Sequence, residues 1–584
     1  MLYFRWLVFL GLTILAIIGI LPNIEYYSNY FNRDLKSESE ISYSNELKDK
    51  SLTLGLDLQG GIHMVLELDL VDFYKNLVDE RIKNDFEIIS RFSNQLIKIH
   101  NQSTSNNFID NLFIQVDNKV LIRYYSDLIP DNLKEEKAAE SLKIELKNKL
   151  ITELPSVTEI IRKRVDAMGL IEPDIYTRGN NQIIVEIPGM SDEKRAKELI
   201  QKTGKLEFFI VNNDQSILDE LSDSIDVRIN KGIKLKDKIL VTPTGESIGG
   251  NLKIATKMKN QIDSILSSQS IKTLLSDYDY QFLWGKEEFG DTQKLYFLNK
   301  KVELSGNEMK NPSSEQYNFE HQNSGDWYIS FNLLNPGKFE ELTTNNTGKQ
   351  LAIVLDGTIE SAPHINGPIS GGKGMISGDF TAKEAKDLET ILKAGELPAK
   401  INIISQNQVE ASLGASSIKS SFKTMIFAFI MILGFMFFYY KGFGLLANLA
   451  VILNLLFIIA FLSNPWINAT LTLSGIAGII LTIGMAIDAN VIIFERIKEE
   501  IINGKRPFDA IEFGYQKAFR TILDSNLTTL ISAGSLYLFA SGSIKGFAIT
   551  LSIGIICSMF TAIFITKTIV LTFFKIKNIS KLSI

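Results

Sequence analysis

Residues that form cross-links or bind metals are almost missing from this sequence. There is one cysteine, Cys557, among 584 residues, so the chain can build neither an internal disulfide nor a zinc site made of thiolates. The histidines are also few, and their positions lack the spacing of metal-ligand pairs: His63, His100, His321 and His364. We therefore expect neither a bound metal nor a cofactor.

An excess of positive charge is missing too. The chain has 61 Lys and Arg against 67 Asp and Glu, which gives a formal net charge of −6. Binding to nucleic-acid phosphates needs clustered basic residues without matching acids. The composition therefore excludes a nucleic-acid-binding protein.

Motifs of catalysis and nucleotide binding are absent or incomplete. Residues 367–374 nearly spell a phosphate-binding loop, but Gly374 stands where a serine or threonine would bind magnesium. Residues 55–61 fail the glycine pattern of dinucleotide-binding proteins, and neither a serine nucleophile elbow nor a His-Glu-x-x-His pair occurs. We therefore expect no enzymatic activity and no ATP site.

Long apolar runs, by contrast, are plentiful at the two ends of the chain. A helix needs about 20 mostly apolar residues to cross the hydrocarbon layer of a membrane. Six segments qualify and predict a polytopic α-helical membrane protein with six transmembrane helices: 3–21, 424–440, 442–463, 471–494, 525–543 and 546–574. A cleaved signal peptide is the alternative for the first segment. We interpret it as a retained anchor, because its apolar stretch is long and no small-residue cleavage site follows.

Basic residues predict the orientation, because short loops rich in Lys and Arg stay on the cytoplasmic side. Such residues gather between the fourth and fifth segments and after the sixth: Arg496, Lys498, Lys505, Arg506, Lys517, Arg520, Lys575, Lys577 and Lys581. Both termini are then cytoplasmic, with a tail at 576–584, and Lys441 lies in a tight inner turn. The region between the first two segments is placed outside the cytoplasm.

That outer region reads as a large α+β domain, residues 51–422, behind a polar tether at 23–50. Apolar residues alternate over 52–70 except at Gly60, which predicts a strand with one buried face. Within it, Asp57, Gly60 and Gly61 are expected to form a structural hairpin, since glycine adopts positive φ at low cost.

Three helices of this domain are predicted from their ends. One begins at a capping box of Ser156 and Glu159, and the others span 191–204 and 381–395. The last two share an Ala-Lys-acid-Leu core followed by a strand-like run, and chance similarity of two charged helices is the alternative. The repeat predicts a ferredoxin-like base with an inserted head. The first transmembrane helix is expected at 1–22 and a five-helix membrane domain at 423–575. Between them, the base is expected at about 51–70, 152–210 and 376–412, and the head at about 300–375. We assign no role to residues 71–150 and 211–300.

One acid lies deep in an apolar run. Asp488 is the only charged residue between Lys441 and Glu495, and it lies about 10 Å from the cytoplasmic boundary at 1.5 Å per residue. A carboxylate at that depth costs about 2.5 to 3.5 kcal/mol on insertion scales, and such residues mark ion pathways. Gly484 lies one turn earlier on the same face. We therefore expect Asp488 to face the bundle interior as a proton relay, with a structural hydrogen bond between helices as the alternative.

The fifth segment repeats part of this pattern. Its Asp524-Ser-Asn526 mirrors Asp488-Ala-Asn490, and Arg520 precedes Asp524 by four residues, which predicts an ion pair near the inner surface. Support of the relay and a purely interfacial role both stay open for Asp524. The candidate supporting residues are Gly484, Asn490, Arg520, Asp524 and Asn526.

Four blocks, residues 54–63, 162–170, 484–496 and 521–530, carry a resemblance to a known family. With them the chain resembles the SecD/SecF family of the resistance-nodulation-division superfamily, and within it the SecD members. The resemblance covers most of the chain except 71–150 and about 211–300. It departs from many relatives at Gln59, where they carry a basic residue.

The resemblance implies a protein-translocation subunit of the bacterial inner membrane, with its large domain in the periplasm. It implies Asp488 as the fourth-span proton relay, and the proton-motive force as the energy source for moving unfolded preproteins. The implied partners are SecF, as a separate chain, and SecYEG, with YajC and YidC as further candidates.

Two other functions stay open. A proton-coupled exporter of small molecules or lipids in the same superfamily would share these features, but such exporters usually carry two halves in one chain. A scaffold without ion coupling would leave Asp488 as structural glue, which the cost of the buried acid argues against. A neighbouring gene for a second six-span chain would favour the first function.

Overall fold

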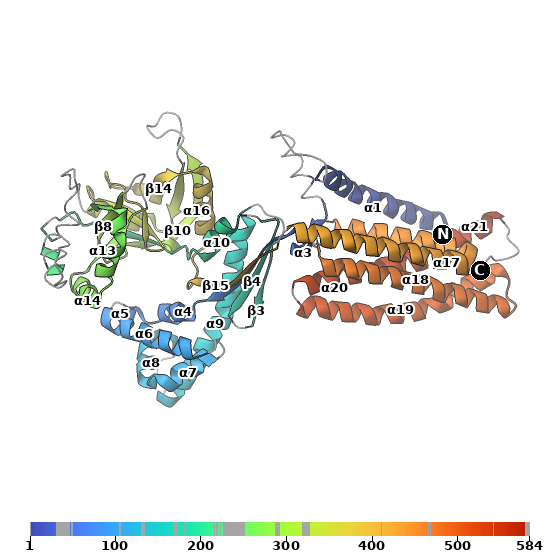
Figure 1. Ribbon diagram of the computed structural model, residues 1–584, viewed down its shortest axis with the longest axis horizontal. Coiled ribbons are helices and arrows are strands. Elements are labelled where there is room, and N and C mark those ends of the chain that lie inside the picture. The colour runs from blue at the N-terminus through green and yellow to red at the C-terminus, as the bar shows by residue number, and fades with distance from the viewer. Residues whose placement is uncertain are drawn as a thin grey trace.

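The computed structural model has a globular α+β part and a bundle of long helices, joined near α3 (Figure 1). Its description covers residues 2–30, 47, 51–83, 85–103, 107–129, 135–168, 173–179, 181–190, 192–214, 216–217, 220–221, 224–225, 251–286, 292–317, 327–409, 411–464, 467, 469–540 and 542–577. Most of the predicted tether lies outside these residues, as do Gly169 and Ser191.

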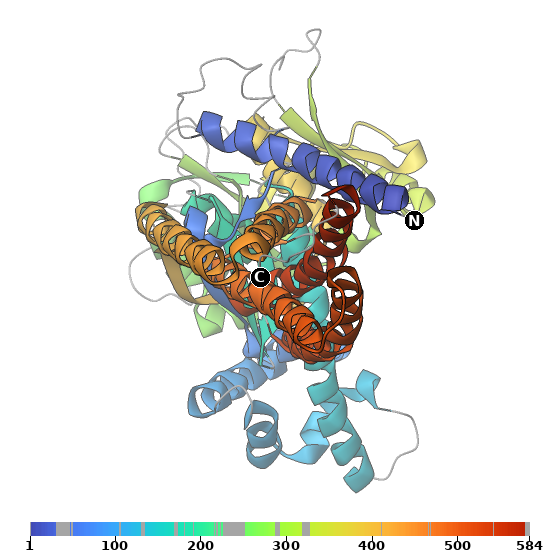
Figure 2. The ribbon, with the colours of Figure 1, turned by 90° about the vertical axis from the view of Figure 1, so that its right-hand side faces the viewer.

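The bundle contains the long apolar helices of the chain. They are α1 (Leu2–Tyr30), α17 (Ala411–Leu462), α18 (Leu473–Ile502), α19 (Pro507–Phe539), α20 (Ser543–Met559), a π-helical stretch (Phe560–Ile565) and α21 (Thr566–Lys577). Viewed along the bundle, α1 lies at its edge (Figure 2). It contacts α17 and α21.

Four helices of the described residues are long and apolar enough to cross a membrane: Tyr3–Tyr26, Lys423–Leu462, Leu473–Ile502 and Ser543–Phe574. The chain reverses inside the second of them, because Lys441 has non-helical backbone angles of φ 48° and ψ −116°. Gly444 makes this reversal possible, since a Cβ there would lie 1.9 Å from the carbonyl oxygen of Met436. The predicted turn at Lys441 is therefore confirmed.

A four-stranded antiparallel sheet next to the bundle forms the base. Its strands lie in the order β15-β2-β4-β3, with bounds Ile401–Val409, Gly61–Leu68, Gln182–Pro188 and Asp174–Arg178. The strand predicted over 52–70 is only partly formed. The chain instead forms β1 (Thr53–Leu54), a helical turn α3 (Leu56–Gln59) and then β2, because Gly60 and Gly61 adopt φ values of 74° and 138°.

Two helices contact this sheet, α9 (Glu135–Asp166) and α10 (Glu193–Gln201). A third helix, α16 (Ala382–Ala394), contacts α9 but packs mainly against the head. The capping box of Thr381 and Glu384 at the start of α16 is confirmed. The predicted start at Ser156 is wrong, because α9 runs through Pro155. Its buried stripe continues across that point without a break: Leu142, Leu146, Leu150, Leu154, Val157, Ile161 and Val165.

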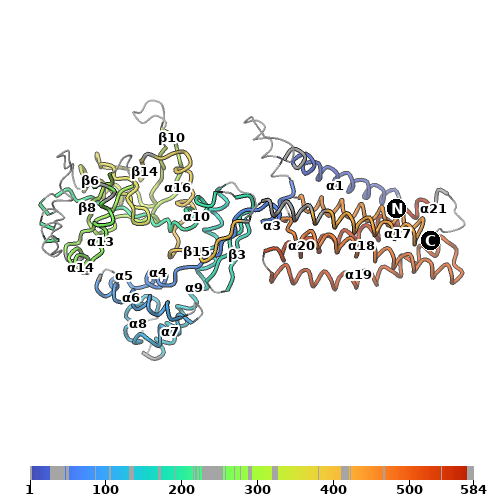
Figure 3. The backbone as a smooth tube through the Cα atoms, in the orientation of Figure 1, coloured from blue at the N-terminus to red at the C-terminus, as the bar shows by residue number. Residues whose placement is uncertain are grey.

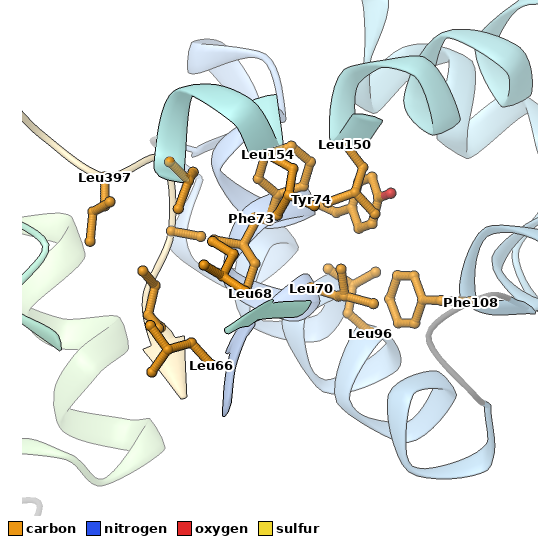
Figure 4. Packing of buried hydrophobic residues seen from close by; sticks show 14 of the residues in the cluster. Leu66, Leu68, Leu70, Phe73, Tyr74, Leu96, Phe108, Leu150, Leu154 and Leu397 are labelled. Carbon is orange, nitrogen blue, oxygen red and sulfur yellow. The ribbon is translucent and has the colours of Figure 1, made fainter. Parts of the chain in front are cut away.

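The helices between Leu70 and Leu128 form a subdomain on the same core (Figure 4). Its elements are α4 (Leu70–Asn76), α5 (Glu80–Lys83), α6 (Phe86–Gln102), α7 (Phe108–Gln115), α8 (Asn118–Tyr124) and a 3-10 turn η2 (Ser126–Leu128). Figure 4 shows Leu66 and Leu68 of β2 continuing into Phe73, Tyr74 and Phe108 of the helices. The base and this subdomain therefore share one hydrophobic core.

The head lies farther from the bundle and combines two sheets (Figure 3). One has the order β13-β12-β5-β9, with bounds Thr358–Ser361, Leu351–Leu355, Leu206–Ile210 and Leu304–Ser305. The other has the order β10-β11-β14, with bounds Met309–Gln316, Trp327–Leu333 and Lys373–Phe380. Helix α15 (Pro336–Asn345) and the 3-10 turns η4 (Gly306–Glu308) and η5 (Ser370–Gly372) complete it. Strand β5, which lies in the range predicted for the base, thus pairs within the head.

A third, smaller sheet extends the head. Its order is β6-β8-β7, with bounds Asn251–Ala255, Thr292–Asn299 and Tyr280–Trp284. The turn η3 (Thr256–Met258) and helices α13 (Lys259–Leu266) and α14 (Gln269–Asp277) follow β6. Single bridges connect Val211 with Leu298 and Gly285 with Ile359, so this unit is continuous with the head.

Candidate functional site

The predicted relay residue lies on the outer face of α18. Asp488 is exposed in this chain, and Gly484 lies one turn away with no atom within 4 Å of the Cβ that it lacks. The other exposed positions of the helix continue the same stripe: Leu473, Ala477, Leu481, Glu495, Glu499 and Ile502. The expectation that Asp488 faces the interior of the bundle is therefore wrong, although Gly484 does share its face.

The small residues of α18 explain the error. Gly475, Gly478, Ala486 and Ala489 are buried, and they lie on the other side of the helix from Asp488. A Cβ on Gly478 would lie 2.4 Å from Oγ1 of Thr550 on α20. The close helix packing predicted from these residues exists. It holds α18 against its own bundle and leaves the acid on the opposite face.

The two asparagines of the repeated pattern have the same local geometry. Nδ2 of Asn490 donates to the carbonyl oxygen of Ala486 at 3.0 Å, and Nδ2 of Asn526 donates to that of Ile522 at 2.8 Å. Asn490 is buried, and its Oδ1 has no hydrogen-bond partner among the described residues. A buried polar atom on the inner face of α18, two residues after Asp488, is thus left to accept a further hydrogen bond.

The predicted pair of Arg520 and Asp524 is not formed. Both side chains are exposed on α19, and neither takes part in an ion pair within the described part of the chain. Their positions start a polar stripe on the outer face of α19: Thr521, Asp524, Ser525, Thr528, Ser532 and Ser535. Because these hydroxyls and this carboxylate lie among the apolar residues of the second half of α19, this helix resembles α18 in presenting polar groups away from its own bundle.

An open groove of about 1040 Å³ lies between α18 and α19. Ile492, Glu495 and Arg496 line one wall, and Lys517 and Arg520 line the other. Ile492 follows Asp488 by one helical turn. The groove therefore begins one turn from the acid and is lined by charged residues of both helices.

A buried ion cluster lies where α18 ends and α19 begins. Glu500 is 2% exposed, and its carboxylate lies 2.7 Å from Nζ of both Lys505 and Lys517. Nη2 of Arg496 lies 3.7 Å away. Removing one partner from such a cluster leaves a buried charge without compensation, so we assign it to holding the two helices together.

The predicted hairpin residues lie between the bundle and the base. Asp57 is exposed in the first turn of α3, while Gly60 and Gly61 are buried. A Cβ on Gly61 would lie 2.2 Å from the carbonyl oxygen of Ile187, and its φ of 138° disfavours any side chain. The two glycines therefore lie at a junction between a helical turn and a strand, and not in a hairpin of two strands.

The group of acids around Glu186 on the base was not predicted from the sequence. Glu186 of β4 lies 3.4 Å from the hydroxyl of Tyr176 and 3.9 Å from Nε2 of His63. Burial, and then the nearby Asp174 and Asp57, raise the pKa of Glu186 to about 7. Burial and then Arg178 lower the pKa of His63. Glu186 occupies an ordinary polar position of a strand, and its sequence neighbours gave no signal of this environment.

Metal-binding groups are also absent from the described residues, in which no three His, Cys, Asp or Glu side chains gather to hold an ion. The sequence offered few such side chains to begin with. The arrangement that stands out chemically is instead a carboxylate in the apolar part of a membrane helix, with an open glycine one turn before it and a groove that begins one turn after it.

Three family models match the chain. Residues 154–213 match the N-terminal part of the P1 domain of protein translocase subunit SecDF, and residues 281–399 match the SecDF P1 head subdomain. Residues 389–575 match the C-terminal region of the protein export membrane proteins SecD and SecF.

Curated relatives match along almost the whole chain. The protein translocase subunit SecD of Rickettsia bellii is 37% identical over 580 residues, which are 97% of this chain and 96% of that protein. The SecD subunit of Magnetococcus marinus is 34% identical over 551 residues, which are 92% and 93% of the two chains. A crystal structure of SecDF from Thermus thermophilus, described as a translocon-associated membrane protein, is 25% identical with a TM-score of 0.47, and the match covers 98% of this chain but 59% of that longer one. The chain therefore belongs to the SecD/SecF family of protein-export membrane proteins, where it corresponds over nearly its full length to the SecD subunits.

Proposed function

We propose that this chain works with a separate SecF chain to couple the proton-motive force to the translocation of unfolded preproteins. Sec-dependent protein export follows from the family, and the coupling is our proposal. The observation that carries it is the position of Asp488, a carboxylate exposed on α18 where the rest of the exposed stripe from Leu473 to Ile492 is apolar or glycine. A charge facing lipid at that depth would cost about 2.5 to 3.5 kcal/mol, so we expect a second membrane protein to cover it.

SecF is the partner that fits this face. Two outer stripes, on α18 and α19, place polar groups toward the outside of the bundle. Gly484 leaves space for a close helix approach beside the acid. In the assembled complex Asp488 would then lie at the interface of two chains, where it can exchange a proton without facing lipid. Arg520, Asp524, Asn490 and Asn526 are the candidate supporting residues, since they lie on the same two helices.

Six membrane spans fit the geometry of the bundle better than four. The helical segment Lys423–Leu462 reverses at Lys441, so it supplies two spans of about 20 residues each. Helix α19 is 33 residues long and packs against α18 and α20, although its polar stripe lowers its apolar character. We therefore propose that α19 is the fifth span and that a partner covers its polar face.

The proposed orientation places the globular domain in the periplasm of the bacterial inner membrane. Nε1 of Trp6 donates to Thr572 at 2.8 Å, and the hydroxyl of Tyr440 donates to Glu495 at 3.2 Å. The start of α1, the end of α21 and the Lys441 turn thus lie with the basic loop at the end of the bundle far from the globular part (Figure 1). The positive-inside rule assigns this end to the cytoplasm.

The translocon SecYEG is the expected larger partner, with YajC and YidC as further candidates. The periplasmic domain would bind the emerging preprotein, and the membrane domain would supply the energy. An exporter of small molecules or lipids is the second candidate. The near full-length match to curated SecD subunits favours protein export over it. We also propose that the chain has no enzymatic activity and no cofactor, because neither the sequence motifs nor the described residues provide a site for them.

Asp488→Asn is the test of the coupling, because asparagine keeps the shape of the side chain and removes its titratable proton. A potential of 100 mV supplies about 2.3 kcal/mol per charge, a bias of roughly fiftyfold, only if the charge is bound and released. We expect Asp488→Asn to remain stable and bound to SecF while losing proton-force-dependent export. Asp488→Glu should keep part of the activity. Full export by the asparagine variant would reduce Asp488 to a structural contact.

A further inference from the structure

The segment between the first span and the base is paired directly with the helix that carries Asp488. Strand β1 pairs in parallel with β16 (Thr470–Leu471), with Thr53 opposite Thr470 and Leu54 opposite Leu471. The amide of Gly55 then donates to the carbonyl oxygen of Leu471 at 2.8 Å. Because β16 leads straight into α18, this ladder is attached to the outer end of that helix.

Thr472 makes the attachment tight. Its Oγ1 accepts from the amide of Gly475 at 3.0 Å and so caps α18. Its methyl group lies 2.9 Å from the position that a Cβ on Gly55 would take. The beginning of α20 closes the other side, since a Cβ on Gly546 would lie 2.7 Å from Oγ1 of Thr472. One threonine therefore contacts the connecting segment, α18 and α20 at once.

Helix α3 continues the same segment on the surface of the bundle. Its amides at Leu58 and Gln59 donate to the carbonyl oxygen of Gly55 at 3.0 Å each. Leu58 is 3% exposed, belongs to the hydrophobic cluster of the membrane helices, and lies on the element that contacts α17. Figures 1 and 3 show α3 at the junction of the two parts of the molecule.

The other end of the segment is fixed to the base. The amide of Gly189 donates to the carbonyl oxygen of Gly60 at 2.9 Å. Gly61 begins β2 and pairs with Pro188 on one side and Val409 on the other. Strand β2 lies inside the sheet, between β15 and β4. No residue from Thr53 to Gly61 is therefore left as a slack linker.

We infer that residues 53–61 act as a rigid strut that carries movement of α18 to the central strand of the base. This inference rests on the proposed function, in which Asp488 exchanges a proton, and adds that this exchange moves α18. Asp488 lies 16 residues after Thr472, a distance of about 24 Å along the helix. A tilt or shift of α18 would move β16, then β1 and α3, and then β2, because each step is a hydrogen-bonded or buried contact rather than a loop. The glycines serve the strut by allowing its close contacts.

The first test lengthens the strut. Two glycines inserted between Gln59 and Gly60 separate the end held by the bundle from the end held by the base. We expect this full-length variant to accumulate and co-purify with SecF, and to lose proton-force-dependent export to the level of Asp488→Asn. The matched control carries the same two glycines after Gly179, in an exposed turn of the base with open space around it. Export by the strut variant equal to that of the control would overturn the inference.

The second test locks the membrane end of the strut. Thr53→Cys and Thr470→Cys are placed opposite each other in neighbouring strands, which suits a disulfide. In a Cys557→Ser background, oxidation should leave export unchanged, because a rigid strut does not open or slide during its cycle. The same protein after reduction is its own control. Loss of export on oxidation, reversed by reduction, would show that β1 and β16 must separate, and would sink the idea.

The third test examines the contact of Gly55 with Thr472. Gly55→Ala places a methyl group against the Thr472 methyl, which cannot turn away without giving up the cap of α18. Thr472→Ser removes that methyl and keeps the capping oxygen. We expect Gly55→Ala to reduce export by roughly tenfold and the double variant to restore most of it, the sign of a direct coupling. Additive effects of the two changes would contradict the assigned contact.

Failure of the strut and failure of the proposed function give different results. If the strut is wrong, the lengthened variant exports like the control while Asp488→Asn does not. If proton coupling is wrong, Asp488→Asn itself exports normally. Proton uptake by vesicles containing the lengthened variant gives a further readout, since the membrane half should still accept protons when its connection to the base is cut.

Discussion

Arg164 of α9 donates a hydrogen bond of 3.0 Å to the carbonyl oxygen of Gly395, 231 positions later in the chain. The same fully buried guanidinium donates to Leu199, Lys202 and Thr203. Gly395 and Lys202 end α16 and α10, so one cation binds the C-terminal carbonyls of two helices, where the helix dipole is negative. Burial lowers the pKa of Arg164 to about 10, which still leaves it charged at neutral pH.

The buried core of the base predicts that the periplasmic domain is stable without the membrane helices. Residues 51–410, produced without the membrane helices, should be soluble and unfold in one cooperative transition, because the base has its own buried core. The transition midpoint should not change with a chelator or a reductant, since the single cysteine lies outside this region. Thermal unfolding followed by circular dichroism, with and without EDTA and dithiothreitol, checks both statements. A midpoint that falls with either reagent would contradict them.

Replacement of Arg164 should weaken this domain strongly. Arg164→Met leaves several buried carbonyl oxygens without donors, and we expect a loss of about 3 kcal/mol or more in the free energy of unfolding. Lys163→Met is the matched control, because Lys163 is exposed on the next position of the same helix. Urea denaturation of the two variants measures the difference. Equal free energies of unfolding for the two variants would mean that water donates to these carbonyl oxygens in place of Arg164.

The acid cluster on the base predicts a dependence of stability on pH. The pKa of Glu186 is raised from 4.5 to about 7 in the folded state, mainly by burial. The folded state therefore binds this proton more tightly, so the extra stability is present below about pH 4.5 and is lost as the pH rises through 7. Between pH 5 and 8 the domain should lose up to about 3 kcal/mol.

Glu186→Gln should remove most of that slope and stabilise the domain at pH 8. Unfolding free energies measured at several pH values in the variant and the parent test this. Glu193→Gln, on an exposed position of α10, serves as the control. A parent protein whose stability is flat from pH 5 to 8 would show that Glu186 is not the group that matters.

Gly484 predicts where the partner binds. Gly484→Leu meets open space within this chain, so the protein should keep its own fold. Association with SecF should weaken by roughly tenfold or more, because the added side chain fills the path of an approaching helix. Gly434→Leu is the control, since Gly434 of α17 is also open but lies on a different helix. Co-purification and export of both variants check this, and a normal complex with Gly484→Leu would move the interface elsewhere.

Local patterns predicted part of this molecule well. The capping box at Thr381, the turn at Lys441 and the shared face of Gly484 and Asp488 depend on neighbours within a few residues. Ser156 failed as a helix start because the same pattern also occurs inside helices, and the buried stripe of α9 continues across Pro155.

The face of α18 on which Asp488 lies could not be predicted from the sequence. The sequence has two faces of α18 with small residues, and both allow close packing. Periodicity identifies the acid and its depth, but it does not say whether the neighbouring helix belongs to the same chain. The ladder between Thr53 and Thr470 was equally hidden, because two strands of two residues have no period to detect and lie 417 residues apart.

The order of strands in the base has a consequence for folding during synthesis of the chain. Strand β15 pairs with β2 more than 330 residues after β2 has been made, and the whole head is encoded between them. During synthesis the base sheet therefore waits for its last strand while the head, whose strands come earlier, can already fold. Strand β15 is followed directly by α17. The base is completed only when the chain is about to return to the membrane, so its closure marks the moment at which the outer domain is finished.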